Sequence, residues 1–187
     1  MSKTLYIHGF ASSGQSPKSA DLMHILEQPV IAPDLTHQPL QDLASLERLL
    51  LQEDISVVVG SSLGGFYAYA LFLKHHQKTI LINPSLRPYD TLTDQLGQVK
   101  SFKHGADFEW TMQQINELQK ISEDMTKMRQ DSQIDLSKIL VLLAQNDERL
   151  NYQEAAQLFE GAKIIIDPQQ DHRFSDLWRY MAAIQRL

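Results

Sequence analysis

Residues 55–76 read ISVVVGSSLGGFYAYALFLKHH, and this stretch decides the fold. Residues 55–60 form a short apolar run rich in valine, which is typical of a buried strand. The run passes without a polar loop into Gly-Ser-Ser-Leu-Gly-Gly, and residues 66–73 then carry apolar side chains at helical spacing. The stretch therefore predicts a strand, a tight turn and a helix in direct succession.

Further apolar runs resemble the run at 55–60, and segments with helical spacing separate them. Continuous hydrophobic strands are covered on both faces, which indicates a parallel sheet with right-handed crossovers. We therefore expect a single doubly wound α/β domain over residues 1–187 whose six parallel strands have the order 2-1-3-4-5-6. The expected strands are residues 4–9, 29–34, 55–60, 78–84, 138–145 and 162–168.

Residues 87–137 interrupt this alternation, because they contain no candidate strand. Residues 107–128 read DFEWTMQQINELQKISEDMTKM and carry an apolar stripe from Phe108 to Met128 at helical spacing. This pattern predicts a small helical insertion around residues 90–135. The helix could pack on the sheet, or it could form a small cap over a ligand pocket, with residues 87–107 as a loop over the same pocket.

Composition excludes several classes of protein. The formal net charge is -6 and the basic residues are scattered, which argues against a nucleic-acid partner and favours a small uncharged or acyl-type ligand. The chain has no cysteine, so a cysteine nucleophile, a disulfide and a thiolate metal site are excluded. Without a signal peptide or an apolar run near twenty residues, we expect a soluble cytoplasmic protein with no membrane span.

The turn after the strand at 55–60 contains the pattern Gly-x-Ser-x-Gly, with Ser62 at its centre. In a strand-turn-helix context this pattern is typical of a nucleophile elbow, which makes Ser62 the candidate nucleophile. The free N–H of Leu63 would then face negative charge that develops at the reacting centre. The alternative is a tight turn whose serines only cap the helix.

The first expected strand ends in His8-Gly9-Phe10. A His-Gly turn after a strand resembles the oxyanion loop of serine hydrolases, so Phe10 and Leu63 are the two candidate backbone donors. His8 could contact substrate, but we favour a role in shaping this loop over proton transfer.

Asp147 and His172 follow the last two expected strands. The carboxyl ends of parallel strands gather ligand chemistry, and the order Ser62, Asp147, His172 matches nucleophile, acid and base in α/β-hydrolases. Taken singly, Asp147 could be a turn or capping residue and His172 a structural histidine. Asp171 is a poor alternative to Asp147, because neighbours in a short loop rarely present side chains to each other.

Other polar residues point to no metal or cofactor. Asp34 and His37 have no third ligand nearby in the sequence, and no His-Glu-x-x-His pattern exists. Arg87 follows the fourth expected strand, where it could line a substrate pocket, contact an anionic substrate or hold the 87–105 loop through an ion pair. We favour the ion pair.

Motifs along nearly the whole chain resemble the YqiA-type family of small bacterial esterases, which are compact α/β-hydrolases. The resemblance implies an esterase that cleaves acyl esters or thioesters, with Ser62, Asp147 and His172 as the matching triad positions. The chain departs from the family pattern at Gln169 and Gln170, where smaller residues are usual, so the resemblance does not predict the shape of the loop that carries His172. The motifs are LYIHGFASS, VVGSSLGGFYA, INPSLRPYDTLTDQLGQ, AQNDERLNYQEA and DHRF.

The sequence thus predicts a serine esterase that needs no cofactor and acts on a small-molecule acyl ester or thioester. Two alternatives stay open. The same residues would serve an acyl-CoA thioesterase or an acyltransferase, and the fold could also belong to a non-catalytic binding module. The sequence does not determine the physiological substrate, the acyl chain length or whether the protein is a monomer or a homodimer.

Overall fold

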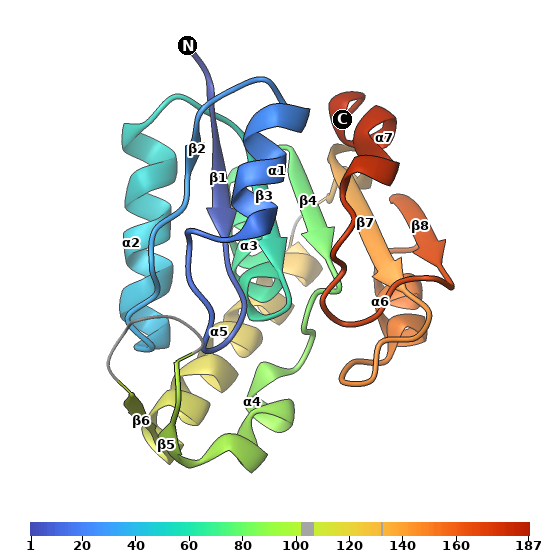
Figure 1. Ribbon diagram of the computed structural model, residues 1–187. Coiled ribbons are helices and arrows are strands. Elements are labelled where there is room, and N and C mark those ends of the chain that lie inside the picture. The colour runs from blue at the N-terminus through green and yellow to red at the C-terminus, as the bar shows by residue number, and fades with distance from the viewer. Residues whose placement is uncertain (102–106, 132) are drawn as a thin grey trace.

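The computed structural model describes residues 1–101, 107–131 and 133–187 (Figure 1). Its main sheet has six strands in the order β2-β1-β3-β4-β7-β8, and every neighbouring pair is parallel. This confirms the predicted doubly wound sheet and its strand order. The strands are β1 (Lys3–Ile7), β2 (Val30–Ile31), β3 (Ile55–Ser61), β4 (Thr79–Ile82), β7 (Ile139–Ala144) and β8 (Lys163–Asp167).

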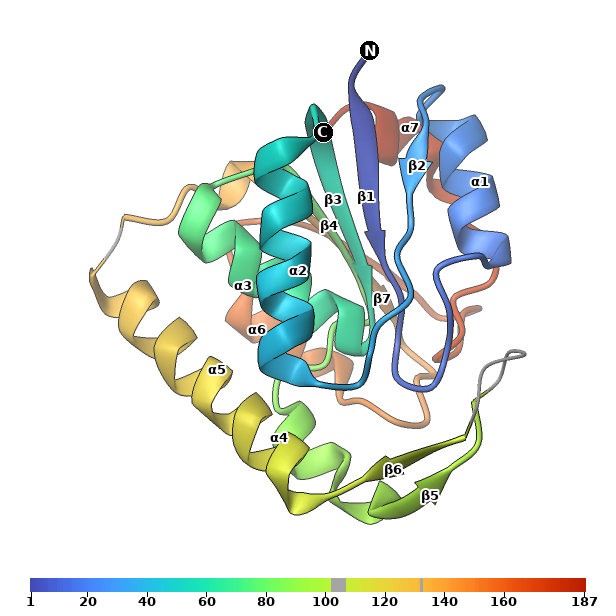
Figure 2. The same ribbon diagram turned by 90° about the vertical axis from the view of Figure 1, so that its left-hand side faces the viewer.

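Helices cover both faces of the sheet (Figure 2). One face carries α2 (Pro39–Gln52), α3 (Leu63–His75), α5 (Met112–Asp131) and α6 (Tyr152–Leu158), and the other carries α1 (Pro17–Ile25) and α7 (Met181–Gln185). Alternate residues along a strand pack in the two different cores, so Leu5 and Tyr6 point to opposite faces of the sheet. The short α4 (Pro88–Thr91) follows β4, and single 3-10 turns lie at Thr93–Gln95, Leu136–Lys138 and Trp178–Tyr180.

α3 is the most buried helix that the structure describes. Every residue from Leu63 to Leu73 is buried, which accounts for the unbroken apolar sequence of this segment. α3 contacts β3 and β4 on one side and α2 and α5 on the other. Because it begins directly at the turn after β3, the central position of α3 also fixes the position of that turn.

The insertion differs from the prediction, because it contains two strands. β5 (Gly97–Val99) and β6 (Phe108–Trp110) form an antiparallel pair, and α5 begins only at Met112. Two contacts explain the difference: Trp110 packs on Phe10 with ring centroids 4.9 Å apart, and the Thr111 hydroxyl accepts a hydrogen bond from the Gln113 amide at the start of α5. The apolar spacing of Phe108 and Trp110 is thus the two-residue period of a strand.

The helix of the insertion packs on the helices that cover the sheet, and the interpretation as a cap over a ligand pocket stays a prediction. Ile115, Leu118, Ile121 and Met125 are buried and attach α5 to the core beside α2 and α3. The β5–β6 pair lies beyond the carboxyl ends of the parallel strands (Figure 2).

Among the described residues, no helix is long and apolar enough to cross a membrane.

Candidate active site

Ser62 occupies the turn between β3 and α3 in a strained backbone conformation, with φ 55° and ψ -117°. Its amide donates to the Ile82 carbonyl at 3.0 Å, and its carbonyl accepts from the amides of Gly65 at 2.9 Å and Ser85 at 3.0 Å. These bonds hold the strained turn against the end of β4. The Ser62 hydroxyl makes no hydrogen bond within the described part of the chain, so it is free to act on a ligand.

Glycines on both sides of Ser62 let the turn pack closely. A Cβ atom at Gly60 would lie 2.2 Å from the Gly64 carbonyl oxygen, and one at Gly64 would lie 2.0 Å from the Ile7 carbonyl oxygen. Both contacts are with backbone atoms, which cannot move without disturbing β1 or α3. The Gly-x-Ser-x-Gly pattern is therefore a steric requirement of this turn.

We expect Gly64→Ala to prevent correct folding, because its methyl group would overlap the carbonyl that ends β1. Thermal unfolding followed by circular dichroism should give a lower Tm or no cooperative transition. Gly97→Ala is the comparison: no atom lies within 4 Å of the Cβ position there, so only the backbone strain at its positive φ of 109° should lower its Tm, and a steric overlap is absent. A Gly64→Ala protein as stable as the wild type would contradict the steric argument.

The two candidate backbone donors, Leu63 and Phe10, belong to segments that adjoin Ser62. Leu63 begins α3, so its N–H has no intrahelical acceptor and points out of the positive end of the helix. Gly9 packs against the nucleophile turn, since a Cβ atom on it would lie 3.3 Å from Ser62 Cβ and 3.8 Å from Ser62 Oγ. Within the described ranges, neither the Phe10 nor the Leu63 amide donates a hydrogen bond.

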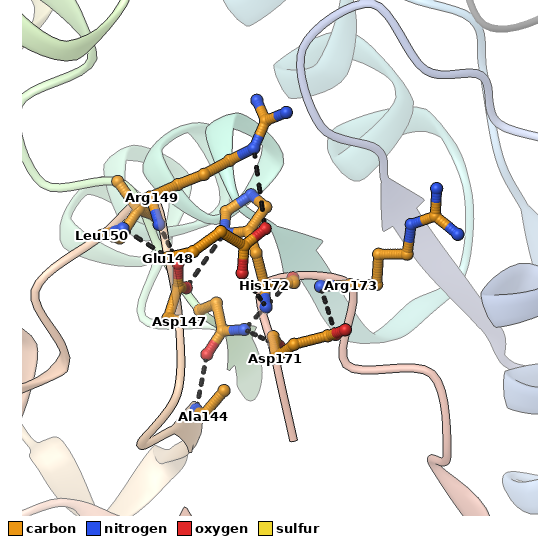
Figure 3. A network of polar contacts seen from close by, with 9 residues as sticks. Ala144, Asp147, Glu148, Arg149, Leu150, Asp171, His172 and Arg173 are labelled. Carbon is orange, nitrogen blue, oxygen red and sulfur yellow. Dashed lines mark hydrogen bonds and ion pairs between the residues drawn. The ribbon is translucent and has the colours of Figure 1, made fainter. Parts of the chain in front are cut away.

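Asp147 and His172 come together from the loops that follow β7 and β8, as Figure 3 shows. His172 Nδ1 lies 3.0 Å from Asp147 Oδ1 and 2.9 Å from Oδ2. The amides of Arg149 and Leu150 donate to Oδ1 at 2.8 and 2.9 Å, so the carboxylate has fixed partners. The Asp147 side chain is only 2% exposed and that of His172 16% exposed, which leaves the histidine ring open on one side.

The surroundings keep Asp147 ionised. Burial acts to raise its pKa, but the hydrogen bonds from His172 and from two backbone amides outweigh burial and hold the pKa below its usual range. A charged carboxylate on Nδ1 makes that nitrogen the protonated one and leaves Nε2 as the basic atom of the ring. No hydrogen bond joins His172 to Ser62 in the described residues.

The Asp171 carboxylate bonds a group other than the His172 ring. One of its carboxylate oxygens accepts from the Arg173 amide at 2.9 Å, which closes the turn after the histidine. The His172 amide instead donates to Glu148 Oε2 at 3.2 Å, so the two loops are tied at a second point (Figure 3). Asp171 therefore shapes the histidine loop, while Asp147 holds the ring.

Asn83 is a residue that sequence reasoning missed. It is 3% exposed and follows β4 directly, in a left-handed conformation with φ 41°. Its side-chain amide donates to the carbonyls of Asp171 at 3.1 Å and His172 at 3.2 Å, and its Oδ1 accepts from the Ala144 amide at 2.7 Å. Asn83 thus ties the histidine loop to the end of β7. A strand ending in Asn-Pro was the available signal, because asparagine tolerates this conformation.

His8 and Arg87 occupy other positions. His8 is 1% exposed; its Nε2 accepts from the Leu35 amide at 3.0 Å and its Nδ1 lies 2.8 Å from the Gly9 carbonyl, contacts that shape the loop and leave little surface for substrate. Arg87 is exposed and binds Glu154 on α6 at 2.8 Å, so it holds the segment after β4 to α6. This ion pair is thus with α6 and not with Asp147 or His172.

A cavity of about 380 Å³ lies between the loop after β1 and the β5–β6 pair. We call it the hairpin cavity. Phe10 lines one side and Arg149, two residues after Asp147, lines another, while Gln98 and Lys100 come from the hairpin. Phe10 also packs on Phe108 and Trp110, so the hairpin is attached to the same loop. The hairpin cavity therefore adjoins the candidate oxyanion loop.

Within the described ranges, no group of three or more His, Cys, Asp or Glu side chains is placed to hold a metal ion. Asp34 instead accepts from the Gly14 amide at 2.7 Å. His37 stacks on Phe108 with ring centroids 3.6 Å apart, and burial, with a smaller contribution from His8, lowers its pKa to about 4. Both side chains thus have structural partners.

A family model described as "Uncharacterised protein family (UPF0227)" matches residues 3–187. The chain belongs to this family. It is 24% identical over 194 residues to the UPF0227 protein YcfP of Escherichia coli O9:H4 (strain HS), and 26% identical over 190 residues to a UPF0227 protein of Shewanella woodyi. Each alignment covers 97% of this chain and 96% of the relative. These matches confirm the family resemblance of the sequence motifs.

Solved structures similar to this UPF0227 protein have the α/β-hydrolase fold. The esterase domain of a Rhodothermus marinus protein aligns with a TM-score of 0.64 and 21% identity, covering 99% of this chain and 84% of that one. A putative hydrolase from Agrobacterium vitis S4 aligns with a TM-score of 0.66 and 19% identity, covering 98% and 87%. At these identities the likeness establishes the fold of the UPF0227 chain.

Proposed function

We propose that this UPF0227 protein is a serine hydrolase that cleaves small acyl esters or thioesters. The observation that carries the proposal is the Asp147–His172 pair, which is built on two loops at the sheet end where Ser62 occupies its strained turn. A nucleophile, a base and an orienting acid from three strand ends are the parts that acyl transfer requires. The similarity to esterases and other hydrolases supports the same reaction class.

In the first half of the reaction, Ser62 Oγ attacks the acyl carbonyl carbon while His172 Nε2 takes the hydroxyl proton. Asp147 stabilises the resulting imidazolium through Nδ1. The carbonyl oxygen becomes an oxyanion, which the amides of Phe10 and Leu63 stabilise; one such donor is worth about 10²- to 10³-fold in rate. The tetrahedral intermediate collapses, the bond to the alcohol or thiol breaks, and His172 gives the leaving group its proton.

In the second half, water attacks the acyl-enzyme. His172 takes a proton from the water and returns it to Ser62 Oγ, which releases the carboxylic acid. The proposal requires Nε2 to reach Ser62 Oγ once substrate is bound, because catalytic hydrogen bonds often tighten only in the complex. Substrate enters through the hairpin cavity, since Phe10 lines that cavity.

Labelling with a fluorophosphonate tests the proposal. We expect one adduct per chain in the intact mass, and peptide mapping should place it on Ser62. Ser62→Ala should abolish the label, while Ser61→Ala, the neighbouring serine at the end of β3, should keep it. A folded wild-type protein that takes no label, or takes it elsewhere, would overturn the proposed function.

The finer choice between ester and thioester substrates needs a second measurement. Hydrolysis of p-nitrophenyl esters from about two to sixteen carbons should be compared with hydrolysis of acyl-CoA thioesters of the same lengths. We expect the esters to give the larger kcat/KM. A kcat/KM that is higher for the thioesters at every length would assign the protein to the thioesterases instead.

Asn83→Ala should lower kcat by about 10²-fold and leave KM nearly unchanged, because a small displacement of His172 weakens catalysis without removing substrate contacts. Asn83→Asp should also lower kcat, since it removes both donors and keeps the acceptor for Ala144. Steady-state kinetics on a p-nitrophenyl ester gives both constants. Asn116→Ala, on the exposed face of α5, is the control. Unchanged kcat in a folded Asn83→Ala protein would contradict this role.

A further inference from the structure

A second cavity, of about 290 Å³, lies between α3, the segment after β4, α5 and α6. We call it the α3 cavity. Taking about 30 Å³ per water molecule, it has room for about ten waters. The α3 cavity adjoins the back of the nucleophile turn, because Gly65 and Ser85 line it and their amides bond the Ser62 carbonyl. None of the proposed catalytic side chains lines it, and neither does Phe10 or Leu63, so this inference does not depend on the proposed function.

The walls of the α3 cavity are apolar and its mouth is charged. Gly65 and Ser85 are buried, whereas Arg87, Arg129 and Glu154 are exposed, so the cavity opens to solvent on the charged side. An apolar interior with a few polar groups is typical of a small-molecule site. The apolar and aromatic walls come from Phe66, Tyr69, Leu86, Met125, Leu158 and Phe159.

One of the two arginines at the mouth has carboxylate partners and the other has none among the described residues. Arg87 and Glu154 form an ion pair at 2.8 Å, and Arg87 also lies 3.5 Å from Asp90, which is not part of the lining. Arg129 forms no ion pair with any residue that the structure describes. Arg87 is therefore held by two carboxylates, and Arg129 is the lining cation without a carboxylate partner among the described residues.

Tyr69 supplies an unused donor in the same cavity lining as Arg129. Its side chain is 4% exposed and lines the cavity, and its hydroxyl has no hydrogen-bond partner among the described residues. Burial raises the pKa of Tyr69, an effect that the nearby charge of Arg129 opposes, so the hydroxyl stays protonated and can donate. A guanidinium and a neutral donor together suit one carboxylate.

We propose that the α3 cavity binds a medium-chain aliphatic monocarboxylate. Its chain lies against the apolar walls, and its carboxylate lies at the mouth on Arg129 and the Tyr69 hydroxyl. A single negative charge matches the single unpaired cation, and a larger polar anion would leave the apolar walls unfilled. The straight chain suits a cavity that runs beside α3 from Gly65 to Tyr69, a rise of about 6 Å along the helix at 1.5 Å per residue.

Isothermal titration calorimetry with octanoate tests the proposal. We expect a Kd below about 1 mM for the wild type and a Kd about tenfold weaker for Arg129→Gln, because a charge-assisted hydrogen bond is lost. Tyr69→Phe should weaken binding about threefold. The matched control is Lys127→Gln, which removes a cation of α5 that does not line the cavity. Octanol, which has the same chain without the charge, should bind equally to wild type and Arg129→Gln.

Methyl NMR of the methionines locates the bound octanoate. The Met125 methyl lines the α3 cavity and its resonance should shift, while the resonance of Met112, exposed at the start of α5 and outside the lining, should not. Thr126→Trp should reduce both the shift and the affinity by covering the mouth, and circular dichroism should show that the protein remains folded. Ser62→Ala should leave octanoate binding unchanged, so a failed labelling experiment at Ser62 would not bear on this site.

Three results would overturn the proposal. One is the absence of octanoate binding below about 10 mM, which corresponds to less than about 3 kcal/mol of binding free energy. Another is an equal Kd for wild type and Arg129→Gln. The third is loss of octanoate binding in the Ser62→Ala protein, which would place the ligand in the catalytic site and not in the α3 cavity.

Discussion

Ser62→Ala and His172→Ala should each remove nearly all ester hydrolysis, a loss on the order of 10⁵ to 10⁶ in kcat by analogy with other triads. The two substitutions should cost about the same, because the nucleophile and its base act as one unit. Without Ser62 Oγ no acyl-enzyme can form, and without His172 the hydroxyl stays protonated at neutral pH. Steady-state hydrolysis of a p-nitrophenyl ester measures both.

A measurement of Tm distinguishes this loss of catalysis from a loss of the folded protein. The Ser62 hydroxyl has no partner in the described residues, so its removal should leave Tm close to that of the wild type. Ser61→Ala should keep most of the activity, because Ser61 is the last residue of β3 and is not the residue in the strained turn conformation. A Ser62→Ala protein that retained more than about one per cent of the wild-type kcat would assign the nucleophile to another residue.

Asp147→Asn should lower kcat by about 10⁴-fold, the second largest expected effect. The substituted amide presents a donor to Nδ1, which favours the tautomer that carries its proton on Nε2 and leaves no base facing Ser62. Part of the activity should return at high pH, where hydroxide supplies the missing base. A pH–rate profile of kcat from about pH 6 to 10 would reveal this recovery.

Asp171→Asn is the matched control for Asp147→Asn, since both remove one carboxylate beside His172. Asp171 bonds the Arg173 amide, and an asparagine side-chain oxygen can accept that bond equally well. We expect a change in kcat of less than about tenfold, which is less than about 1.4 kcal/mol in the transition state. If Asp171→Asn were the inactive variant and Asp147→Asn kept most of its rate, the acid would be Asp171.

The β5–β6 pair marks where sequence reasoning was wrong. The stripe from Phe108 to Met128 fits helical spacing, but Phe108 and Trp110 are fixed by contact with Phe10 and His37, which lie far away in the sequence. The spacing of apolar residues along the chain gives no information about contacts with residues far away in the sequence. The structure shows Thr111 as the capping residue at this boundary, a signal that the sequence analysis did not use.

The amino-acid sequence by itself determined the parallel sheet, its strand order and the turn at Ser62, because each depends on local patterns: continuous apolar runs, alternating helices and glycines at fixed spacing. The sequence also favoured Asp147 over Asp171, but only the tertiary structure brings the Asp147 carboxylate to the ring of His172. Tertiary structure also decided that Asn83 joins two loops and that Arg129, which has no ion pair among the described residues, lies at the mouth of a cavity. These facts depend on where separate segments meet in space, which no local pattern encodes.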